Sequence, residues 1–310
     1  MHKKVLLAID NTRPSKMAVR YAVQISKSVP DLQFVLLNVQ PMVSQFLKDE
    51  AKTNSSARKQ VEKIQKSHVQ FSQQLLEDYR REMESQGIRP DQIETRTQPR
   101  NLGYAKDIID MAQERDYDAI VVGRRGLSGI AKLYAGSVTS DILEQSQVIP
   151  VWLVDGTAPA GDLLLAVDGS EASLRMIDHV SFMLAGTTNI SVTMLHITNS
   201  ANNYCEIDLD ESVTPELDKI VRRGDRACID QFYPHAIKKF EQAGLESGRV
   251  HFETMEGGRR IGKAIFDFAR NRKFQTLVVG RRGLAKSFFM GSVSRHLINN
   301  LSDGALWIVP

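Results

Sequence analysis

Cysteine is almost missing from this chain, which has two in 310 residues. Folds held together by disulfides need a denser, paired set, so the sequence excludes that class of small secreted domain. Cys205 and Cys228 also stand apart from any cluster of histidines or further cysteines, whereas structural zinc sites take about four such ligands. The sequence therefore predicts neither a disulfide framework nor a metal centre.

Long hydrophobic runs are missing as well. The first apolar run, Val5–Ile9, meets Asp10 after five residues, whereas a signal-peptide core needs about 7–15 apolar residues and a membrane helix about 20. The run is typical of a first β-strand. We therefore expect a cytoplasmic protein without a membrane segment.

Charge of one sign is not in excess. Forty lysines and arginines against 37 acidic residues leave a net charge of +3. Proteins that bind nucleic acid through its phosphates concentrate lysine and arginine in tracts or patches, and no dense tract occurs here. A nucleic-acid partner is not expected.

Recognisable catalytic arrangements are absent from the sequence. The seven histidines have no metal-ligand spacing, and no Gly-x-Ser-x-Gly nucleophile elbow occurs. His196 ends an apolar run and His296 lies on an apolar helical face, so we interpret both as structural. The sequence favours a binding protein over an enzyme.

What the chain does contain is an internal repeat. Val5–Asp10 (VLLAID) matches Leu163–Asp168 (LLLAVD), and Pro150–Val154 matches Ala305–Val309 with a tryptophan at the same place. About 300 residues are also more than one core usually holds. We predict a first domain over residues 1–155 and a second over 160–310, joined near Asp155–Gly161.

Short apolar segments alternate with amphipathic ones in each copy, the pattern of βαβ units. Right-handed crossovers then give an α/β fold: an open, five-stranded parallel sheet with helices on both faces, present twice in tandem. The expected strands lie at 4–9, 33–39, 93–97, 118–123 and 150–154, and at 162–167, 190–197, 249–255, 275–280 and 305–309. The expected helices lie at 14–28, 56–87, 103–115 and 137–146, and at 172–185, 215–244, 261–271 and 292–301.

Two polar stretches, 41–57 and 199–215, follow the second strand of each copy without a regular pattern. The long helix after the first stretch is rich in lysine, glutamate and glutamine. We interpret it as a solvated surface helix; a lid or partner-binding surface is the alternative.

The most distinctive segment is VVGRRGL, which occurs at Val121–Leu127 and again at Val278–Leu284. Each copy follows an apolar strand pattern and precedes a Gly-Ser step, at Gly136 and at Gly291, that opens a helical pattern. A glycine loop leading into a helix start gathers unpaired N–H groups and the positive end of the helix dipole. This combination favours an anion such as phosphate.

These features together resemble the universal stress protein family. The resemblance rests on a first strand ending in Asp10 and on the spacing Gly123-x2-Gly126-x9-Gly136-Ser137, and it covers both halves. It implies the strand order 3-2-1-4-5 and binding of ATP, with or without Mg²⁺. In such a sheet the ligand lies beyond the carboxyl ends of the strands, where the strand order reverses.

The resemblance assigns roles to residues of the first half. Asp10 would contact the ribose, Val39 the adenine edge through its main chain, and the glycine loop and helix start the phosphates. The full set is Ala8, Ile9, Asp10, Val39, Gly123, Arg125, Gly126, Gly136, Ser137, Val138 and Thr139. Structural alternatives stay open: Asp10 as a turn residue, Ser137 or Thr139 as helix caps, and Arg125 as a solvated side chain.

The second half departs from the spacing, because seven residues rather than nine separate Gly283 from Gly291. The phosphate loop there would be two residues shorter, and it would either take another path around phosphate or close the site. The candidate residues are Asp168, Ile197, Gly280, Gly283, Gly291, Ser292, Val293 and Ser294.

The second half also contains a near match to another nucleotide-binding motif. Gly257–Ala264 (GGRRIGKA) nearly spells the Walker A loop, but alanine replaces the hydroxyl that holds Mg²⁺. The segment also precedes the third helix of the copy rather than following the first strand. We interpret it as a tight turn into a helix.

The function expected from these observations is a nucleotide-binding regulatory protein in which ATP occupancy changes conformation or partner choice. Hydrolysis would be absent or slow, since no residue pattern supplies a base to position water. The alternatives are an ATP-hydrolysing or adenylating enzyme of a related class, and an interaction module without nucleotide. The apolar last strands predict that the two halves pair as an intramolecular pseudo-dimer, with further homodimerisation open.

Overall fold

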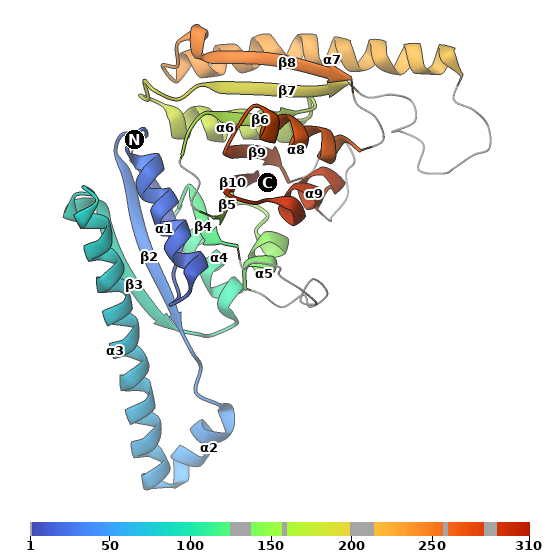
Figure 1. Cartoon of the computed structure of the whole chain (residues 1–310). Coiled ribbons are helices and arrows are strands. Elements are labelled where there is room, and N and C mark those ends of the chain that lie inside the picture. The colour runs from blue at the N-terminus through green and yellow to red at the C-terminus, as the bar shows by residue number, and fades with distance from the viewer. Residues whose placement is uncertain (1, 125–137, 157–159, 199–213, 257–259, 282–289) are drawn as a thin grey trace. The chain divides into compact units, whose positions relative to one another are not determined.

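The computed structural model describes residues 2–124, 138–156, 160–198, 214–256, 260–281 and 290–310. The chain divides into two compact units, Met1–Val23 with Asp31–Val154 and Gln24–Pro30 with Asp155–Pro310. Each unit is an α/β structure built on a parallel sheet (Figure 1). Among the described residues, none of the helices has both the length and the apolarity that a membrane crossing demands.

In the first unit, strands and helices alternate as expected from the sequence. The elements are β1 (Lys3–Ala8), α1 (Arg13–Ser26), β2 (Leu32–Gln40), α2 (Gln45–Thr53), α3 (Ser55–Ser85), the short 3₁₀ helix η1 (Pro90–Gln92), β3 (Ile93–Pro99), α4 (Tyr104–Glu114), β4 (Ala119–Gly123), α5 (Val138–Gln145) and β5 (Val151–Asp155). The strands are parallel in the order β3-β2-β1-β4-β5, which confirms the predicted order.

The second unit repeats this plan. Its elements are β6 (Leu163–Val167), α6 (Glu171–Leu184), β7 (Val192–Thr198), α7 (Pro215–Gln242), the 3₁₀ helix η4 (Ser247–Arg249), β8 (Val250–Glu256), α8 (Ile261–Asn271), β9 (Thr276–Gly280), α9 (Ser292–Asn300) and β10 (Gly304–Val309). The order β8-β7-β6-β9-β10 is the same arrangement.

The central strands form because their residues are apolar on both faces. Val5, Leu6 and Leu7 in β1 are completely buried, as expected for a parallel sheet that helices cover on both sides. Right-handed crossovers place α1 and α3 on one face and α4 and α5 on the other, and α4 packs directly against α5. The turn into α1, the middle of α3 and the starts of α4 and α5 meet at the carboxyl ends of β1, β2 and β4.

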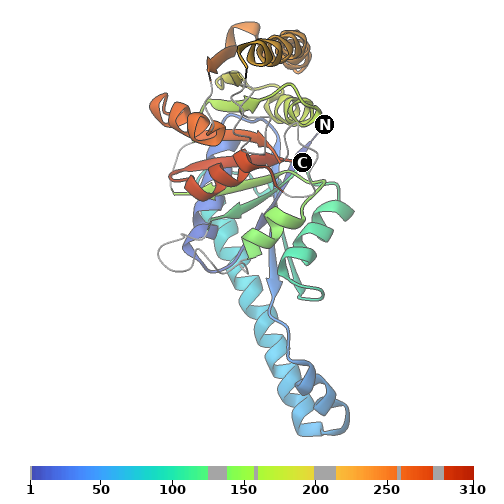
Figure 2. The ribbon, with the colours of Figure 1, turned by 90° about the vertical axis from the view of Figure 1, so that its right-hand side faces the viewer.

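The stretch 41–57, for which the sequence showed no pattern, contains the helix α2. Ser44 caps it by accepting a hydrogen bond from the Leu47 N–H, and Asn54 caps α3 by accepting from the N–H groups of Ser56 and Ala57. None of the residues of α2 is buried, so no apolar periodicity marked it. With the first half of α3 it forms a helical hairpin that extends past the ends of β2 and β3 (Figures 1 and 2).

The interpretation of α3 as a solvated surface helix is wrong for its second half. Only Val61 is buried before residue 72, but a stripe at helical spacing is buried after it, consisting of Ser72, Leu75, Leu76, Tyr79 and Met83. This stripe packs on β2 and β3. The sequence analysis missed this stripe because it judged the helix by its overall composition, in which the charged residues of the opposite face dominate.

The segment that resembles a Walker A loop has a packing role in its described part. Gly262 lies in the first turn of α8, and a Cβ placed on it would come within 2.9 Å of the Cβ of His296 on α9. Glycine is therefore needed where α8 crosses α9. The residues 257–259 lie outside the described ones.

Asp107 offers a test of how the loop before α4 is held. Its buried carboxylate accepts hydrogen bonds from the N–H groups of Asn101 (2.8 Å) and Leu102 (2.9 Å). Asp107→Asn removes one acceptor and turns an amide N–H₂ toward an N–H group, which should lower the free energy of unfolding by about 1–3 kcal/mol. Urea denaturation measures this. Asp110→Asn, which removes only the half-exposed ion pair with Lys106, should change stability by less than about 0.5 kcal/mol; equal effects would contradict the assignment.

Candidate functional site

A cavity of about 470 Å³ lies at the carboxyl ends of β1, β2 and β4 in the first unit. Elements from both faces of the sheet contribute to it: the turn into α1, the middle of α3, the start of α4 and the start of α5. Its lining residues are Ala8, Ile9, Asp10, Asn11, Thr12, Pro14, Ser15, Leu37, Asn38, Val39, Pro41, Ser67, His68, Phe71, Tyr104, Ile108, Val122, Gly123, Val138 and Thr139.

The structure brings together at this cavity all the described candidates of the first half. These are Ala8, Ile9, Asp10, Val39, Gly123, Val138 and Thr139. The candidates Arg125, Gly126, Gly136 and Ser137 lie outside the described residues. The described candidates thus share one site although they come from four separate segments of the chain.

Asp10 organises the turn that ends β1. Its carboxylate Oδ1 accepts hydrogen bonds from the hydroxyls of Ser15 (2.6 Å) and Thr12, and its N–H donates to Ser15 Oγ at 3.0 Å. The turn interpretation of Asp10 is therefore correct. It is compatible with ligand contact, because the residue also lines the cavity.

Val39 lies past the point where β1 ends. The Leu37 carbonyl accepts from the Ile9 N–H at 2.8 Å, and the Gln40 carbonyl accepts from the Arg100 N–H beside β3 at 3.0 Å. Main-chain groups of alternate residues face opposite neighbours in a parallel sheet, so the N–H and C=O of Val39 face the side of β1. Because β1 stops at Ala8, opposite Leu37, these groups are directed at the cavity that Val39 lines.

Gly123 permits a close approach between β4 and the start of α1. A Cβ at this position would lie 2.2 Å from the carbonyl oxygen of Pro14, a distance that no side chain tolerates. The Thr139 hydroxyl donates to the Gly123 carbonyl at 3.1 Å. This hydroxyl therefore ties the start of α5 to the end of β4, a role that the sequence analysis did not foresee.

Helix α3 is fastened to the site by hydrogen bonds that sequence reasoning missed. The Ser72 hydroxyl donates to Asn38 Oδ1 (2.7 Å), and Asn38 Nδ2 donates to the Ile9 carbonyl (2.7 Å). The Tyr79 hydroxyl donates to the Asp10 carbonyl at 3.2 Å. Burial raises the pKa of Tyr79 above its ordinary value, and the Asp10 carboxylate acts in the same direction, so the phenol keeps the proton that it donates.

The second unit has the same turn after its first strand. The Ser173 hydroxyl donates to Asp168 Oδ1 at 2.8 Å, and the Asp168 N–H donates to Ser173 Oγ at 3.0 Å. Ser294 donates to the Gly280 carbonyl at 2.7 Å, as Thr139 does to Gly123. Ile197 is buried in β7, Ser292 and Val293 open α9, and Gly291 precedes them, whereas Gly283 lies outside the described residues.

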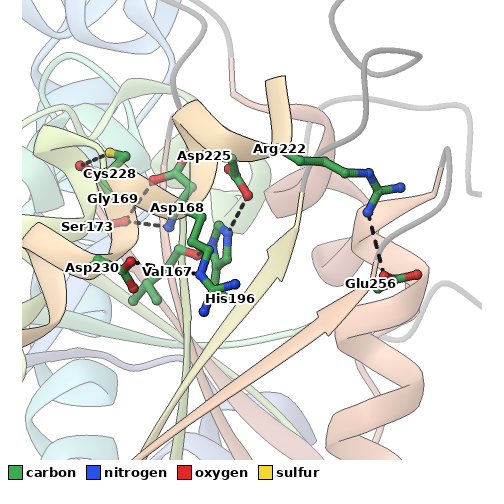
Figure 3. A network of polar contacts seen from close by, with 11 residues as sticks. Val167, Asp168, Gly169, Ser173, His196, Arg222, Asp225, Cys228, Asp230 and Glu256 are labelled. Carbon is green, nitrogen blue, oxygen red and sulfur yellow. Dashed lines mark hydrogen bonds and ion pairs between the residues drawn. The ribbon is translucent and has the colours of Figure 1, made fainter. Parts of the chain in front are cut away.

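Between β7 and α7 the second unit uses a buried histidine and aspartate. His196 Nδ1 lies 3.1 Å from the Val167 carbonyl, and its Nε2 lies 2.8 Å from Asp225 Oδ2 (Figure 3). A carbonyl only accepts, so Nδ1 carries a proton. Both ring nitrogens are engaged with protein groups, which agrees with the structural interpretation of His196.

The described residues contain no group of histidine, cysteine, aspartate and glutamate side chains that could hold a metal ion. The site therefore offers a turn carboxylate, main-chain donors and acceptors, hydroxyls and apolar walls. Groups of this kind are suited to hydrogen bonds and apolar contacts with a small organic ligand.

Comparison with known proteins gives the same repeat. The model of the Universal stress protein family matches residues 1–155 and again residues 161–304. The chain belongs to the universal stress protein family. Universal stress protein Sll1388 from Synechocystis is 26% identical over 46% of this chain and 92% of its own length, so it corresponds to about one unit.

Solved structures show the fold over the whole chain. A universal stress protein from Archaeoglobus fulgidus covers 99% of this chain and 97% of its own, with a TM-score of 0.66 and 18% identity. A universal stress protein solved in complex with cAMP matches 49% of this chain and 97% of its own, at 23% identity and a TM-score of 0.36. The Archaeoglobus fulgidus structure shows the same fold over the whole chain, and the two matches of the family model show two family units in tandem.

Gly123→Ala tests the close approach of β4 and α1. The added methyl meets main chain that cannot rotate away, so the start of α1 must move, at a cost of about 1–3 kcal/mol in unfolding free energy. Thermal and urea denaturation measure this. The control is Gly224→Ala on α7, where a Cβ meets nothing within 4 Å; it should leave stability unchanged or raise it by up to about 1 kcal/mol. Destabilisation by both substitutions alike would argue against a specific contact at Gly123.

Proposed function

We propose that the first unit binds an adenine nucleotide, with ATP as the expected ligand, and that its occupancy regulates conformation or partner binding. Little or no hydrolysis accompanies binding. The observation that carries the proposal is the cavity at the carboxyl ends of β1, β2 and β4, on which the described candidate residues of the first half converge. This is the place where open parallel sheets bind their ligands.

The residues present fit such a ligand. The volume of about 470 Å³ lies within the range of about 300–1,000 Å³ typical of small-molecule pockets. The main chain of Val39 suits the hydrogen-bonding edge of adenine, and Asp10 suits a ribose hydroxyl. The N-terminus of α5, at Val138 and Thr139, suits the phosphates together with Arg125, Gly126, Gly136 and Ser137.

Slow or absent hydrolysis follows from the same residues. Phosphoryl transfer needs a group that orients the attacking water and a metal held against the phosphates. The described lining includes one carboxylate, that of Asp10, whose Oδ1 is engaged by two hydroxyls of its own turn. Any Mg²⁺ would arrive with ATP, since the described residues provide no metal cluster.

We propose a second, weaker site in the second unit. The Asp168–Ser173 turn and the Ser294–Gly280 hydrogen bond repeat the frame of the first site. The phosphate loop is two residues shorter, which reduces the number of main-chain N–H groups available to phosphate. The residues proposed for this site are Asp168, Ile197, Gly280, Gly283, Gly291, Ser292, Val293 and Ser294.

Nucleotide released from the purified, heat-denatured protein tests both proposals. Ala8 lines the first cavity, and Ala166 occupies the matching position in β6, so Ala8→Leu and Ala166→Leu fill one site each. We expect Ala8→Leu to abolish tight binding and Ala166→Leu to remove only the weaker component. Chromatography of the released nucleotide against ATP, ADP, AMP and cAMP identifies the ligand and its stoichiometry.

The outcomes separate the hypotheses. Two nucleotides per chain would support both sites, and one that Ala8→Leu removes would support the first alone. Absence of nucleotide in the purified protein, with no binding of added Mg-ATP, would overturn the proposal and leave an interaction module. Release of phosphate at more than a few turnovers per hour would favour an enzyme.

We also propose that residues 1–155 and 160–310 act as two domains that pair through their last strands, β5 and β10. Apolar edges such as these would promote aggregation if they were left open. Solution X-ray scattering should then report one compact particle with a radius of gyration of about 20 Å, the value expected for a globular chain of this length. A larger radius with a two-peaked distance distribution would show separate domains.

A further inference from the structure

Helix α3 carries an apolar stripe that passes from the sheet to the cavity. The buried residues Ser72, Leu75, Tyr79 and Met83 recur at intervals of three or four. Phe71 lies four residues before Leu75 and therefore belongs to the same face. Past the end of the sheet, this face meets the cavity instead of a strand, and Ser67, His68 and Phe71 line it there.

Phe71 is a large apolar side chain that the protein leaves 55% exposed. A single exposed phenylalanine is ordinary on a protein surface, and Phe46 on α2, 75% exposed, is one. Phe71 differs because it stands at the cavity wall beside His68. An aromatic ring that faces both a binding cavity and solvent is suited to stack on a planar ligand.

The part of helix α3 that carries Phe71 is held in place by hydrogen bonds of its neighbours. The next residue, Ser72, is 1% exposed and is hydrogen-bonded to Asn38, which in turn holds the Ile9 carbonyl at the cavity floor. Tyr79 ties the following turns of the same helix to Asp10. A ring carried on a fastened helix loses little conformational freedom on binding, which favours affinity.

Across the cavity, α4 provides the opposite wall. Because α3 and α4 cover opposite faces of the sheet, the cavity lies between Phe71 on one side and Tyr104 and Ile108 on the other. Tyr104 is already paired with the guanidinium of Arg100, which lies 4.9 Å from its ring centroid. The slot between the two helices is therefore lined by flat or apolar groups on both sides.

We propose that Phe71 is a base-binding residue that stacks on the purine of the nucleotide and closes the outer side of its slot. This inference rests on the proposed function and assigns the base-binding wall to α3, a helix outside the strand ends and glycine loop. His68, one turn earlier on the same face, extends this wall.

The described helix α7 of the second unit has no aromatic residue at the corresponding positions. Ser72 on α3 is hydrogen-bonded to Asn38 on β2, and Asp225 on α7 is hydrogen-bonded to His196 on β7. Ser72 and Asp225 therefore occupy corresponding positions in the two units. Aligned on this pair, α7 has Gly224 where α3 has Phe71, and Val221 where α3 has His68. The two units therefore differ in base recognition as well as in the length of their phosphate loops.

The test measures ATP binding by isothermal titration calorimetry in full-length variants. Phe71→Leu should weaken binding by about 5- to 150-fold, the factor that base–aromatic stacking contributes. Phe71→Trp keeps a flat ring and should bind within about threefold of the unchanged protein, with its fluorescence quenched by ATP.

Phe46→Leu, a matched change at an exposed phenylalanine away from the cavity, should bind normally. Inorganic triphosphate, which has no base, should bind the Phe71→Leu variant and the unchanged protein equally.

The outcomes distinguish the stacking role of Phe71 from nucleotide binding itself. Normal ATP affinity in Phe71→Leu, or equal losses in Phe71→Leu and Phe46→Leu, would overturn the stacking role while leaving nucleotide binding intact. Equal losses for ATP and triphosphate would show a distorted site rather than a lost stack. An unchanged protein that binds no adenine nucleotide would overturn the proposed function and this inference with it, and that result is read from the unsubstituted chain before any variant is compared.

Discussion

Both units depend on a carboxylate that ends the first strand. Asp10 and Asp168 each accept a hydrogen bond from a serine five residues later and return one from their own N–H to its oxygen. This closed turn starts the first helix immediately after the strand. In the first unit β1 therefore stops at Ala8 while the neighbouring β2 runs on to Gln40, and the step between them exposes main-chain groups. The cavity exists because two adjacent strands end at different heights.

The two units then use the same frame with different chemistry. A neutral asparagine and serine join β2 to α3 in the first unit, where a histidine and an aspartate join β7 to α7 in the second. Asn38 also lines the cavity of the first unit. In the second unit, a Cβ on Gly169 would lie 2.7 Å from Cys228 Sγ, so α7 lies directly against the turn after Asp168 (Figure 3). The two units share this frame and differ both in the helix after the second strand and in the length of the phosphate loop.

Much of this was visible in the sequence because it depends on local patterns. Apolar runs predict strands, and both sheets have the strand order that the resemblance implied. The clustering of Asp10, Val39 and Gly123 was predictable too, since parallel strands bring their carboxyl ends to one edge. Helix α2 was not predictable from periodicity, because none of its residues is buried. Its only sequence signals are the capping residues Ser44 and Asn54.

The sequence by itself determined the number of repeats, the succession along the chain of the strands and of the helices other than α2, and the glycines that end β4 and β9. Tertiary structure alone decided what each position on α3 does. Tyr79 and Phe71 lie on one stripe and look equivalent in a helical pattern, yet one is buried against the site's main chain and the other lines the cavity. The physical reason is that a stripe on a helix records only which face is inward. Whether that face meets a strand or a cavity depends on where the sheet beneath it ends. That end is set by the turn after β1, about 60 positions before Phe71 in the chain.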